Sequence, residues 1–217
     1  MDQQENPTVV YRFKHGLYIN LTNYCPNLCV FCIKTKWRMR FDGHNLNLQN
    51  NDPSAETVLA ELDREMQKKP AQEIVFCGYG ESTARLPQLL EVCRVLREKM
   101  RSGQYPPFKI RLNTNGLGNL LNKRDIVPDL KKNVDEVYVS LNAQDEATWR
   151  RLVRPAEGYE DGFASVLEFI RLCARAGFDK VVASCVDKTG ADAAAVKALA
   201  EQNGAEFYLR SFLDEEN

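Results

Sequence analysis

Three cysteines lie close together near the start of the chain, in the segment Cys25-Pro-Asn-Leu-Cys29-Val-Phe-Cys32. Their CxxxCxxC spacing falls on a loop that leaves a predicted strand, Gly16 to Thr22. Three thiolates on so short a loop can each bind one iron of a four-iron cubane, which leaves the fourth iron without a protein ligand. The spacing therefore predicts a [4Fe-4S] cluster on Cys25, Cys29 and Cys32, with one iron open to a further ligand.

The same thiolates also suit a zinc ion, with His44 as the fourth ligand of a tetrahedral set. Zinc sites of this kind normally contain two close pairs of ligands, and the sequence has no second close pair of cysteines. The other cysteines, Cys77, Cys93, Cys173 and Cys185, are isolated at apolar strand or helix positions, where a free cysteine behaves as a small buried hydrophobe. The pattern favours the iron-sulfur cluster over zinc.

Apolar runs of period two alternate with runs of period 3.6 along the whole chain, which is typical of repeated βα units. The predicted strands are Gly16 to Thr22, Glu73 to Cys77, Lys109 to Thr114, Glu136 to Asn142, Lys180 to Val186 and Glu206 to Ser211. The clearest predicted helices are Ser54 to Lys69, Leu86 to Arg101, Phe163 to Ala176 and Asp192 to Asn203, with a broken helix over Leu117 to Asn133. Right-handed crossovers between six such units predict an α/β fold, a partial and open (β/α)6 barrel, in a single domain over residues 1–217.

Short polar segments follow the predicted strands. The second strand leads into Gly-Tyr-Gly-Glu81, where glycines permit close backbone approach and the carboxylate can accept hydrogen bonds from an ammonium group. The third strand leads into Asn115 and the fourth into Ser140, and each of these is equally a helix cap or a turn residue when taken alone. Since the carboxyl ends of parallel strands meet at one edge, we expect these groups to lie near the cysteine loop.

The cysteine loop, with Phe31 directly before its third cysteine, resembles the motif of the radical S-adenosylmethionine (radical SAM) enzymes. The resemblance implies that the open iron binds S-adenosylmethionine and cleaves it reductively to a 5'-deoxyadenosyl radical, which abstracts hydrogen from a substrate. It implies cofactor contacts by Phe31 (adenine), by Gly78, Tyr79, Gly80 and Glu81 (methionine amino group), by Asn115 and Ser140 (ribose or methionine carboxylate), by Arg154 (carboxylate) and by Leu209 (adenine pocket). Arg154 is equally a solvated arginine at a helix end, and Asn113 and Asn142 are candidates to face the substrate.

The compact length and the CPNLCVFC loop followed by IKTKW look like the TatD-associated radical SAM proteins. This likeness implies a TatD-type nuclease as a partner and a substrate related to nucleotides or nucleic acids. A radical SAM enzyme also needs a reducing electron donor such as flavodoxin or ferredoxin. A glycyl-radical activase and a deazapurine-synthase-like enzyme of the same superfamily remain alternatives.

Basic and bulky apolar residues alternate after the cysteines, from Lys34 through Lys36 and Arg38 to Arg40, with Trp37 between them. On an extended segment the basic side chains would share one face, which suits phosphates or a stacked base. A solvated face over an apolar anchor explains the same pattern. The alternative from another class is therefore a non-catalytic iron-sulfur or zinc protein that binds nucleic acid through this segment.

Composition sets broad limits on these interpretations. The 29 basic and 30 acidic side chains give a net charge of −1, so no global field attracts nucleic acid or an anionic membrane. The apolar stretches are interrupted by charges well before they reach the length of a membrane span. We expect a cytoplasmic protein that does not bind membranes.

Overall fold

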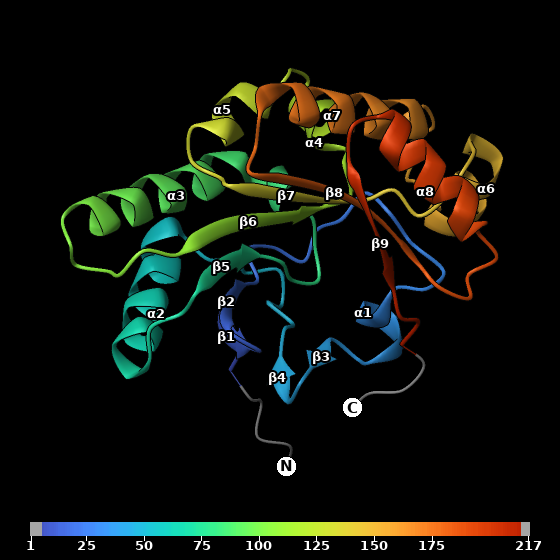
Figure 1. Cartoon of the computed structure of the whole chain (residues 1–217). Coiled ribbons are helices and arrows are strands. Elements are labelled where there is room, and N and C mark those ends of the chain that lie inside the picture. The colour runs from blue at the N-terminus through green and yellow to red at the C-terminus, as the bar shows by residue number, and fades with distance from the viewer. Residues whose placement is uncertain (1–5, 214–217) are drawn as a thin grey trace, which may run out of the picture.

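The computed structural model describes residues 6–213 and is built on one seven-stranded sheet with the order β1-β2-β5-β6-β7-β8-β9 (Figure 1). The strands are β1 (Val10–Phe13), β2 (Gly16–Ile19), β5 (Glu73–Phe76), β6 (Lys109–Thr114), β7 (Glu136–Ser140), β8 (Lys180–Val186) and β9 (Glu206–Arg210). All neighbouring pairs from β2 to β9 are parallel, and β1 pairs antiparallel with β2. The six parallel strands confirm the predicted partial (β/α)6 barrel. The predicted domain's first five and last four residues lie outside the described part.

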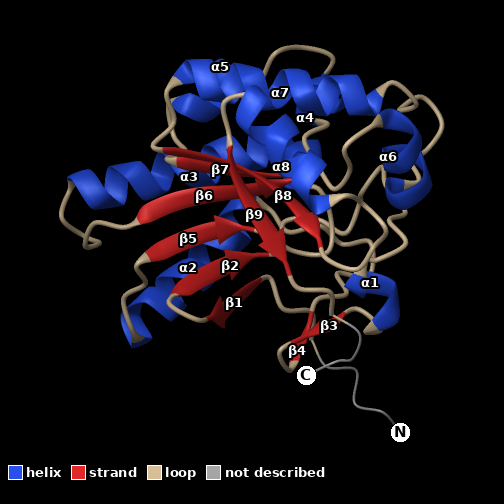
Figure 2. Cartoon of the chain, turned by 45° about the vertical axis from the view of Figure 1, so that its right-hand side comes forward, coloured by secondary structure: helices blue, strands red, loops and turns tan. Residues whose placement is uncertain are grey.

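Helices cover the outer face of the curved sheet, and the small elements that follow the cysteine loop lie on its other side (Figures 1 and 2). The helices are α1 (Ile33–Lys36), α2 (Ala55–Lys68), η1 (Ser82–Arg85), α3 (Leu86–Arg101), α4 (Gly118–Asn122), α5 (Val127–Lys131), α6 (Glu146–Val153), α7 (Gly162–Ala176) and α8 (Ala193–Gln202). A hairpin of β3 (Arg40–Phe41) and β4 (His44–Asn45) completes the described elements. Among the residues described, no helix combines the length and apolar character that a membrane span requires.

Alternation along the strands separates an apolar outer face from a polar inner face. In β6, Ile110 and Leu112 are fully buried, whereas the alternate residues Arg111 and Asn113 are only partly buried. Because successive side chains of a strand point to opposite faces, the first pair faces the helices and the second faces the barrel interior. The sheet therefore presents charged and polar side chains to its concave side.

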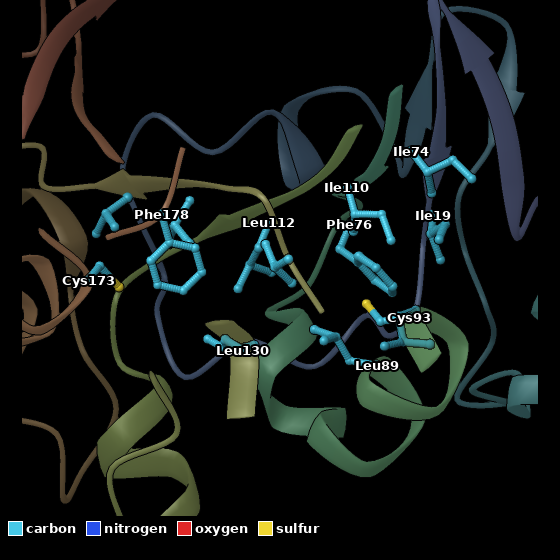
Figure 3. Close-up of a cluster of buried hydrophobic side chains, with 14 of the residues drawn as sticks. Ile19, Ile74, Phe76, Leu89, Cys93, Ile110, Leu112, Leu130, Cys173 and Phe178 are labelled. Carbon is cyan, nitrogen blue, oxygen red and sulfur yellow. The ribbon is translucent and has the colours of Figure 1, made fainter. Parts of the chain in front are cut away.

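The main core lies between the sheet and the outer helices (Figure 3). Phe76 and Leu112 from the strands meet Leu89 and Cys93 of α3, and all four side chains are completely buried. Burial of a large apolar side chain contributes about 1.5–3 kcal/mol, so this layer fixes the positions of the strand ends. Cys93 and Cys173 confirm the prediction that they act as buried hydrophobes.

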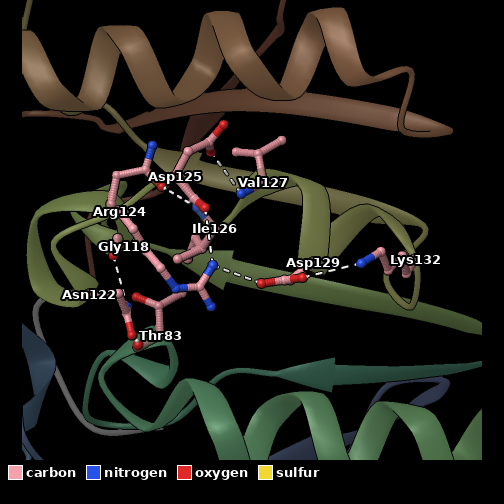
Figure 4. A network of polar contacts seen from close by, with 10 residues as sticks. Thr83, Gly118, Asn122, Arg124, Asp125, Ile126, Val127, Asp129 and Lys132 are labelled. Atoms are coloured by element: carbon pink, nitrogen blue, oxygen red, sulfur yellow. Dashed lines mark hydrogen bonds and ion pairs between the residues drawn. The ribbon is translucent and has the colours of Figure 1, made fainter.

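The segment between β6 and β7 is broken into α4 and α5, as the sequence predicts. Lys123 ends α4 in the left-handed region with φ +53°, and Asp125 accepts a hydrogen bond from the Val127 backbone N–H at 2.9 Å (Figure 4). Asn122 Nδ2 donates to the carbonyl oxygen of Thr83 at 2.9 Å, which ties α4 to η1. The hydrogen bond from α4 to η1 thus links the loop after β5 to the loop after β6. Both loops carry predicted site residues.

Besides η1, the sequence patterns did not predict strand β1, helix α6, the β3–β4 hairpin and helix α1. Strand β1 is joined to β2 by a two-residue turn, Lys14 and His15, which lacks the glycine or asparagine typical of such turns. Helix α6 begins at Asp145, whose side chain accepts from the Thr148 backbone N–H at 2.8 Å. The β3–β4 hairpin turns at Asp42-Gly43, a dipeptide that does favour tight hairpins. Helix α1, the fourth element, has only four residues.

Candidate functional site

The cysteine loop is held in place by the chain segment that follows α6. The backbone N–H of Leu28 donates to the carbonyl oxygens of Val153 and Arg154 at 3.1 and 3.0 Å, and that of Val30 donates to Leu152 at 2.9 Å. A further bond of 2.7 Å joins the N–H of Ala156 to Pro26. Together with the bond from the Glu81 N–H to the Tyr24 carbonyl oxygen just before Cys25, these main-chain bonds fix the loop on both sides before any ligand binds.

The three thiols of the loop are partly buried and lie close enough to interact electrostatically. Burial, together with a smaller contribution from neighbouring thiols, raises the pKa of Cys25 to about 11 and that of Cys29 to about 12. Bound iron would reverse this effect because a metal stabilises the thiolate form. The donor set, three soft sulfur ligands in a preformed loop, fits an iron-sulfur cluster.

The zinc alternative requires Cys25, Cys29, Cys32 and His44 to converge on one ion. No group of three or more His, Cys, Asp or Glu side chains in residues 6–213 is arranged around a single ion. His44 lies in the β3–β4 hairpin, with its ring 5.5 Å from that of Tyr11. In a cubane each cysteine binds a different iron, so the sulfur atoms need not converge on one point.

The glycines after β5 permit the strand end to touch the residues that lead into the cysteine loop. A Cβ atom at Gly78 would lie 2.7 Å from Asn20 Cα, and one at Gly80 would lie 2.7 Å from the Tyr24 carbonyl oxygen. The Glu81 N–H donates to that same carbonyl at 2.8 Å. Close packing explains these glycines directly, and it places Glu81 beside the cysteines.

We expect Gly80→Ala to lower both stability and cluster content. The added methyl group would overlap with backbone atoms, and such overpacking costs about 1–3 kcal/mol. Gly177→Ala is the matched control because Gly177 ends α7 at φ +73° with nothing near its Cβ position, so it should cost about 1–2 kcal/mol and leave the cluster intact. Thermal unfolding and iron content after reconstitution measure the two effects, and a Gly80 variant with full iron content would contradict this interpretation.

Glu81 joins the ends of β5 and β6 through its carboxylate. Its Oε1 accepts from Thr83 Oγ1 at 2.7 Å and from Thr114 Oγ1 at 2.9 Å, and its Oε2 accepts from the Asn115 N–H at 2.7 Å. Burial raises the pKa of this carboxyl, while these donors stabilise its ionised form. Oε1 also accepts from the Thr83 backbone N–H at 3.0 Å, so Oε1 holds three of these bonds and Oε2 one, which leaves Oε2 able to accept from an additional donor such as an ammonium group.

A cavity of about 640 Å³ occupies the concave side of the sheet. Its upper part, at the carboxyl ends of the strands, is lined by Cys25, Gly78, Gly80, Glu81, Asn115, Ser140 and Arg210. Asn115 Nδ2 lies 3.8 Å from Cys25 Sγ, which brings the end of β6 to the cysteine loop. Six predicted site residues from four separate segments therefore line one cavity.

Four other predicted contact residues do not line this cavity. Tyr79 is buried in an apolar cluster with Tyr11 and Leu46, where its hydroxyl donates to the Arg40 carbonyl oxygen. Leu209 is 41% exposed, because its neighbours on β9 take the inward positions. Phe31 is half-buried on the cysteine loop, outside the lining.

Arg154 has an exposed side chain at the end of α6, and its contribution to the site is the main-chain bond to Leu28. This placement agrees with the solvated helix-end alternative. Arg210, which the sequence patterns did not single out, is a cation that does line the upper part of the cavity. Its Nη2 atom donates to Asn142 Oδ1 at 2.9 Å and approaches Ser140 Oγ at 3.4 Å.

Arg210 has no carboxylate partner within 4.0 Å among the described residues, and its Nε atom is buried without a hydrogen-bond partner. Burial lowers the pKa of this guanidinium, and the nearby thiols of Cys77 and Cys29 oppose that shift. Cys77 itself lines the cavity, which corrects the prediction that it is only a buried hydrophobe. The sequence could have predicted Arg210 as a cavity residue from the alternation of side chains along β9, which sets Glu206, Tyr208 and Arg210 on one face of the strand.

The basic segment from Lys34 to Arg40 does not form the continuous basic face that the sequence pattern predicts for an extended chain. Its first part is helix α1, and Lys34 donates to the Asn23 carbonyl oxygen at 2.6 Å. Lys36 lies over the ring of Phe212 at 4.4 Å, and Trp37 is buried against Phe41. The turn of the helix sends the basic side chains to different neighbours, and this removes the geometry on which the phosphate-binding interpretation rested.

Comparison with known proteins shows which protein superfamily the chain belongs to. The model of the Radical SAM superfamily matches residues 19–197, and the chain belongs to this superfamily. It is 26% identical over 147 residues to the dual-specificity RNA methyltransferase RlmN of Helicobacter pylori (strain P12), a match that covers 67% of this chain and 37% of RlmN. The chain thus spans little more than a third of that relative's length.

Solved structures of the superfamily share the fold. A structure of TYW1 with a lysine-pyruvate adduct bound aligns with a TM-score of 0.60 and 15% identity, over 92% of this chain and 65% of TYW1. The FeFe-hydrogenase maturase HydG from Carboxydothermus hydrogenoformans aligns with a TM-score of 0.58 and 18% identity, over 91% of this chain and 44% of HydG. At these identities the likeness supports the partial barrel itself.

Proposed function

We propose that this protein is a radical SAM enzyme that holds a [4Fe-4S] cluster on Cys25, Cys29 and Cys32. The observation that carries the proposal is the position of the three-cysteine loop at the carboxyl end of the barrel, directly above a polar cavity. When bound, the cluster would supply the electron that cleaves S-adenosylmethionine to a 5'-deoxyadenosyl radical, and the chain's own residues position the cofactor and substrate.

Opposite charges on two sides of the upper cavity suit the amino-acid end of S-adenosylmethionine. Glu81 has acceptor capacity for the ammonium group, and Arg210 offers a guanidinium without an acidic partner for the carboxylate. Asn115 and Ser140 line the cavity between them. We therefore assign to Arg210 the carboxylate contact that the resemblance implied for Arg154.

Adenine binding is the second part of the cofactor assignment. Phe31 lies directly before Cys32 and is half-buried, so its ring is available to adjoin adenine beside the cluster. Leu209 is in register with Cys185 on the neighbouring strand, and the residues on either side of it, Tyr208 and Arg210, line the cavity. Tyr79 acts by supporting the loop rather than by contacting the cofactor.

The proposed context is a cytoplasmic enzyme of the TatD-associated group that receives electrons from a flavodoxin or ferredoxin. The CPNLCVFC and IKTKW segments are the support for this finer placement. A TatD-type nuclease as partner and a nucleotide-related substrate follow from the same likeness. Lys34 and Lys36 contact Asn23 and Phe212 of this chain, which disfavours the alternative of non-catalytic nucleic-acid binding.

Anaerobic reconstitution tests the proposal. The protein is loaded with iron and sulfide, reduced with dithionite and given S-adenosylmethionine, and 5'-deoxyadenosine is measured. We expect about four irons and four sulfides per chain and cofactor-dependent 5'-deoxyadenosine. Zinc without sulfide, or a full cluster that never cleaves the cofactor, would overturn the proposal.

A further inference from the structure

The loop that carries the three cysteines exposes apolar side chains on both sides of its central cysteine. Leu28, directly before Cys29, is 72% exposed, more than any other large hydrophobic side chain in residues 6–213. Val30, directly after Cys29, is 40% exposed. Cys29 itself packs against the main core between the sheet and the helices. The loop therefore turns a proposed cluster ligand inward and presents an apolar surface outward, one residue away from that ligand.

This apolar loop surface, Leu28 and Val30, is held in place by main-chain bonds. The backbone N–H groups of both residues donate to the chain at the end of α6, and Asn27 and Pro155 form an isolated β-bridge beside them. A surface that is already ordered loses little conformational entropy when a partner covers it. Weak electron-transfer partners bury less than about 1,200 Å² in total, so a small preordered surface is sufficient for such a contact.

Two arginines at the end of α6 border the apolar loop surface. The Arg154 carbonyl oxygen accepts from the Leu28 N–H, and Arg151 directly precedes the residue whose carbonyl accepts from the N–H of Val30. Both arginine side chains are exposed, and neither has a carboxylate within 4.0 Å in the described part of the chain. Their neighbour Arg150 is instead engaged in an ion pair within α6. Two unpaired positive charges therefore flank the exposed apolar side chains.

The acidic residues that follow the two arginines lie toward the other end of the cysteine loop. Glu157 and Glu160 come after Ala156, whose backbone N–H bonds to Pro26 at the start of the loop. Glu160 also accepts from a backbone N–H in its own turn at 3.0 Å. The positive groups thus adjoin the apolar loop surface more directly than the acidic groups do. Because partners with complementary charge are favoured at such a rim, this arrangement selects an acidic partner.

We infer that the apolar loop surface and its two flanking arginines, Arg151 and Arg154, are the docking site for the protein that reduces the cluster, and that this donor is an acidic flavodoxin. The methyl-substituted edge of a flavin ring is apolar, so it suits Leu28 and Val30. One electron leaves the flavin, which is oxidised, and enters the cluster, which is reduced, and no bond is made or broken. The inference rests on the proposed function, because it concerns delivery of the electron that the cluster uses.

The test mixes reconstituted holoenzyme with fully reduced, purified flavodoxin as the sole electron source. Stopped-flow absorbance follows oxidation of the flavin, and calorimetry measures the affinity of the two proteins. Leu28→Ser should weaken flavodoxin binding about tenfold, since it truncates the apolar centre of the contact. Reversing both charges with Arg151→Glu and Arg154→Glu should lower the second-order rate constant about tenfold or more at low salt, and added salt should shrink this difference. Glu157→Gln, which removes a negative charge, should leave the rate constant equal or higher.

With dithionite in place of flavodoxin, every variant should form 5'-deoxyadenosine within about twofold of the wild-type rate, because a small reductant needs no docking surface and surface substitutions disturb the fold little. Leu120→Ser is the matched control, since Leu120 is an exposed apolar residue of α4, which packs against η1 and α7, and its flavodoxin kinetics should be unchanged.

Three results would each overturn the inference. Flavodoxin could fail to reduce the wild-type cluster, the Leu28 and arginine variants could keep wild-type binding and kinetics, or ferredoxin could replace flavodoxin with the same dependence on Leu28. Failure of the proposed function would look different, because dithionite itself would then yield no 5'-deoxyadenosine with the wild-type protein.

Discussion

Alanine at Cys25, Cys29 or Cys32 is expected to abolish cofactor cleavage. Each thiol is the only protein ligand that the loop offers to one iron, and a neighbouring residue cannot replace it because main-chain bonds fix the loop on both sides. Iron and sulfide content, the visible absorbance of the reconstituted protein and 5'-deoxyadenosine formation measure the effect. We expect 5'-deoxyadenosine to fall to background in all three variants.

Cys93→Ala provides the matched control for these substitutions. Cys93 of α3 is completely buried in the core between the sheet and the outer helices (Figure 3), and it does not line the cavity. Its loss should cost about 1–2 kcal/mol of stability through a small cavity and leave the cluster in place. A loop variant that keeps a full cluster and cleaves the cofactor would contradict the ligand assignment.

Arg210→Met is expected to weaken S-adenosylmethionine binding about 10- to 100-fold, because a charge-assisted contact with a carboxylate contributes about 1.5–3 kcal/mol. Equilibrium dialysis with the reconstituted protein measures the dissociation constant. Arg154→Met should leave the dissociation constant for S-adenosylmethionine unchanged, since the exposed Arg154 side chain lies outside the cavity.

A shortened ligand tests whether Arg210 recognises the carboxylate itself. Because 5'-methylthioadenosine has the adenosine but no amino-acid end, its affinity should be the same in wild type and Arg210→Met. Equal losses for both ligands would show that the substitution disturbs the cavity as a whole. The assignment to Arg210 would also be wrong if Arg154→Met produced the larger loss.

The strands, the long helices and the clustering of the three cysteines could be predicted because each has a local signal. The boundaries of β6, β8 and α3 match the predictions, since each is a strong periodic run with turn residues at its ends. Cys25, Cys29 and Cys32 are close in sequence, so their proximity does not depend on the fold. Glu81 and Asn115 were found because the carboxyl ends of parallel strands share one edge.

The remaining features depend on tertiary contacts. Arg154 and Arg210 are both arginines near the end of an element, and the sequence does not show that one faces solvent while the other faces the cavity. Tyr79 lies between two glycines of the site, yet its side chain packs into the Tyr11 cluster because the β3–β4 hairpin folds over it. Helix α1 similarly redirected Lys34 and Lys36, which an extended chain would have placed together.

The central claim is that three cysteines leave one iron free for S-adenosylmethionine. Electron paramagnetic resonance of the reduced, reconstituted protein tests it most directly, with and without added cofactor. The account predicts that the spectrum of the [4Fe-4S] cluster changes when S-adenosylmethionine is added, because the cofactor becomes a ligand of the fourth iron. A cluster whose spectrum is the same with saturating cofactor would contradict it.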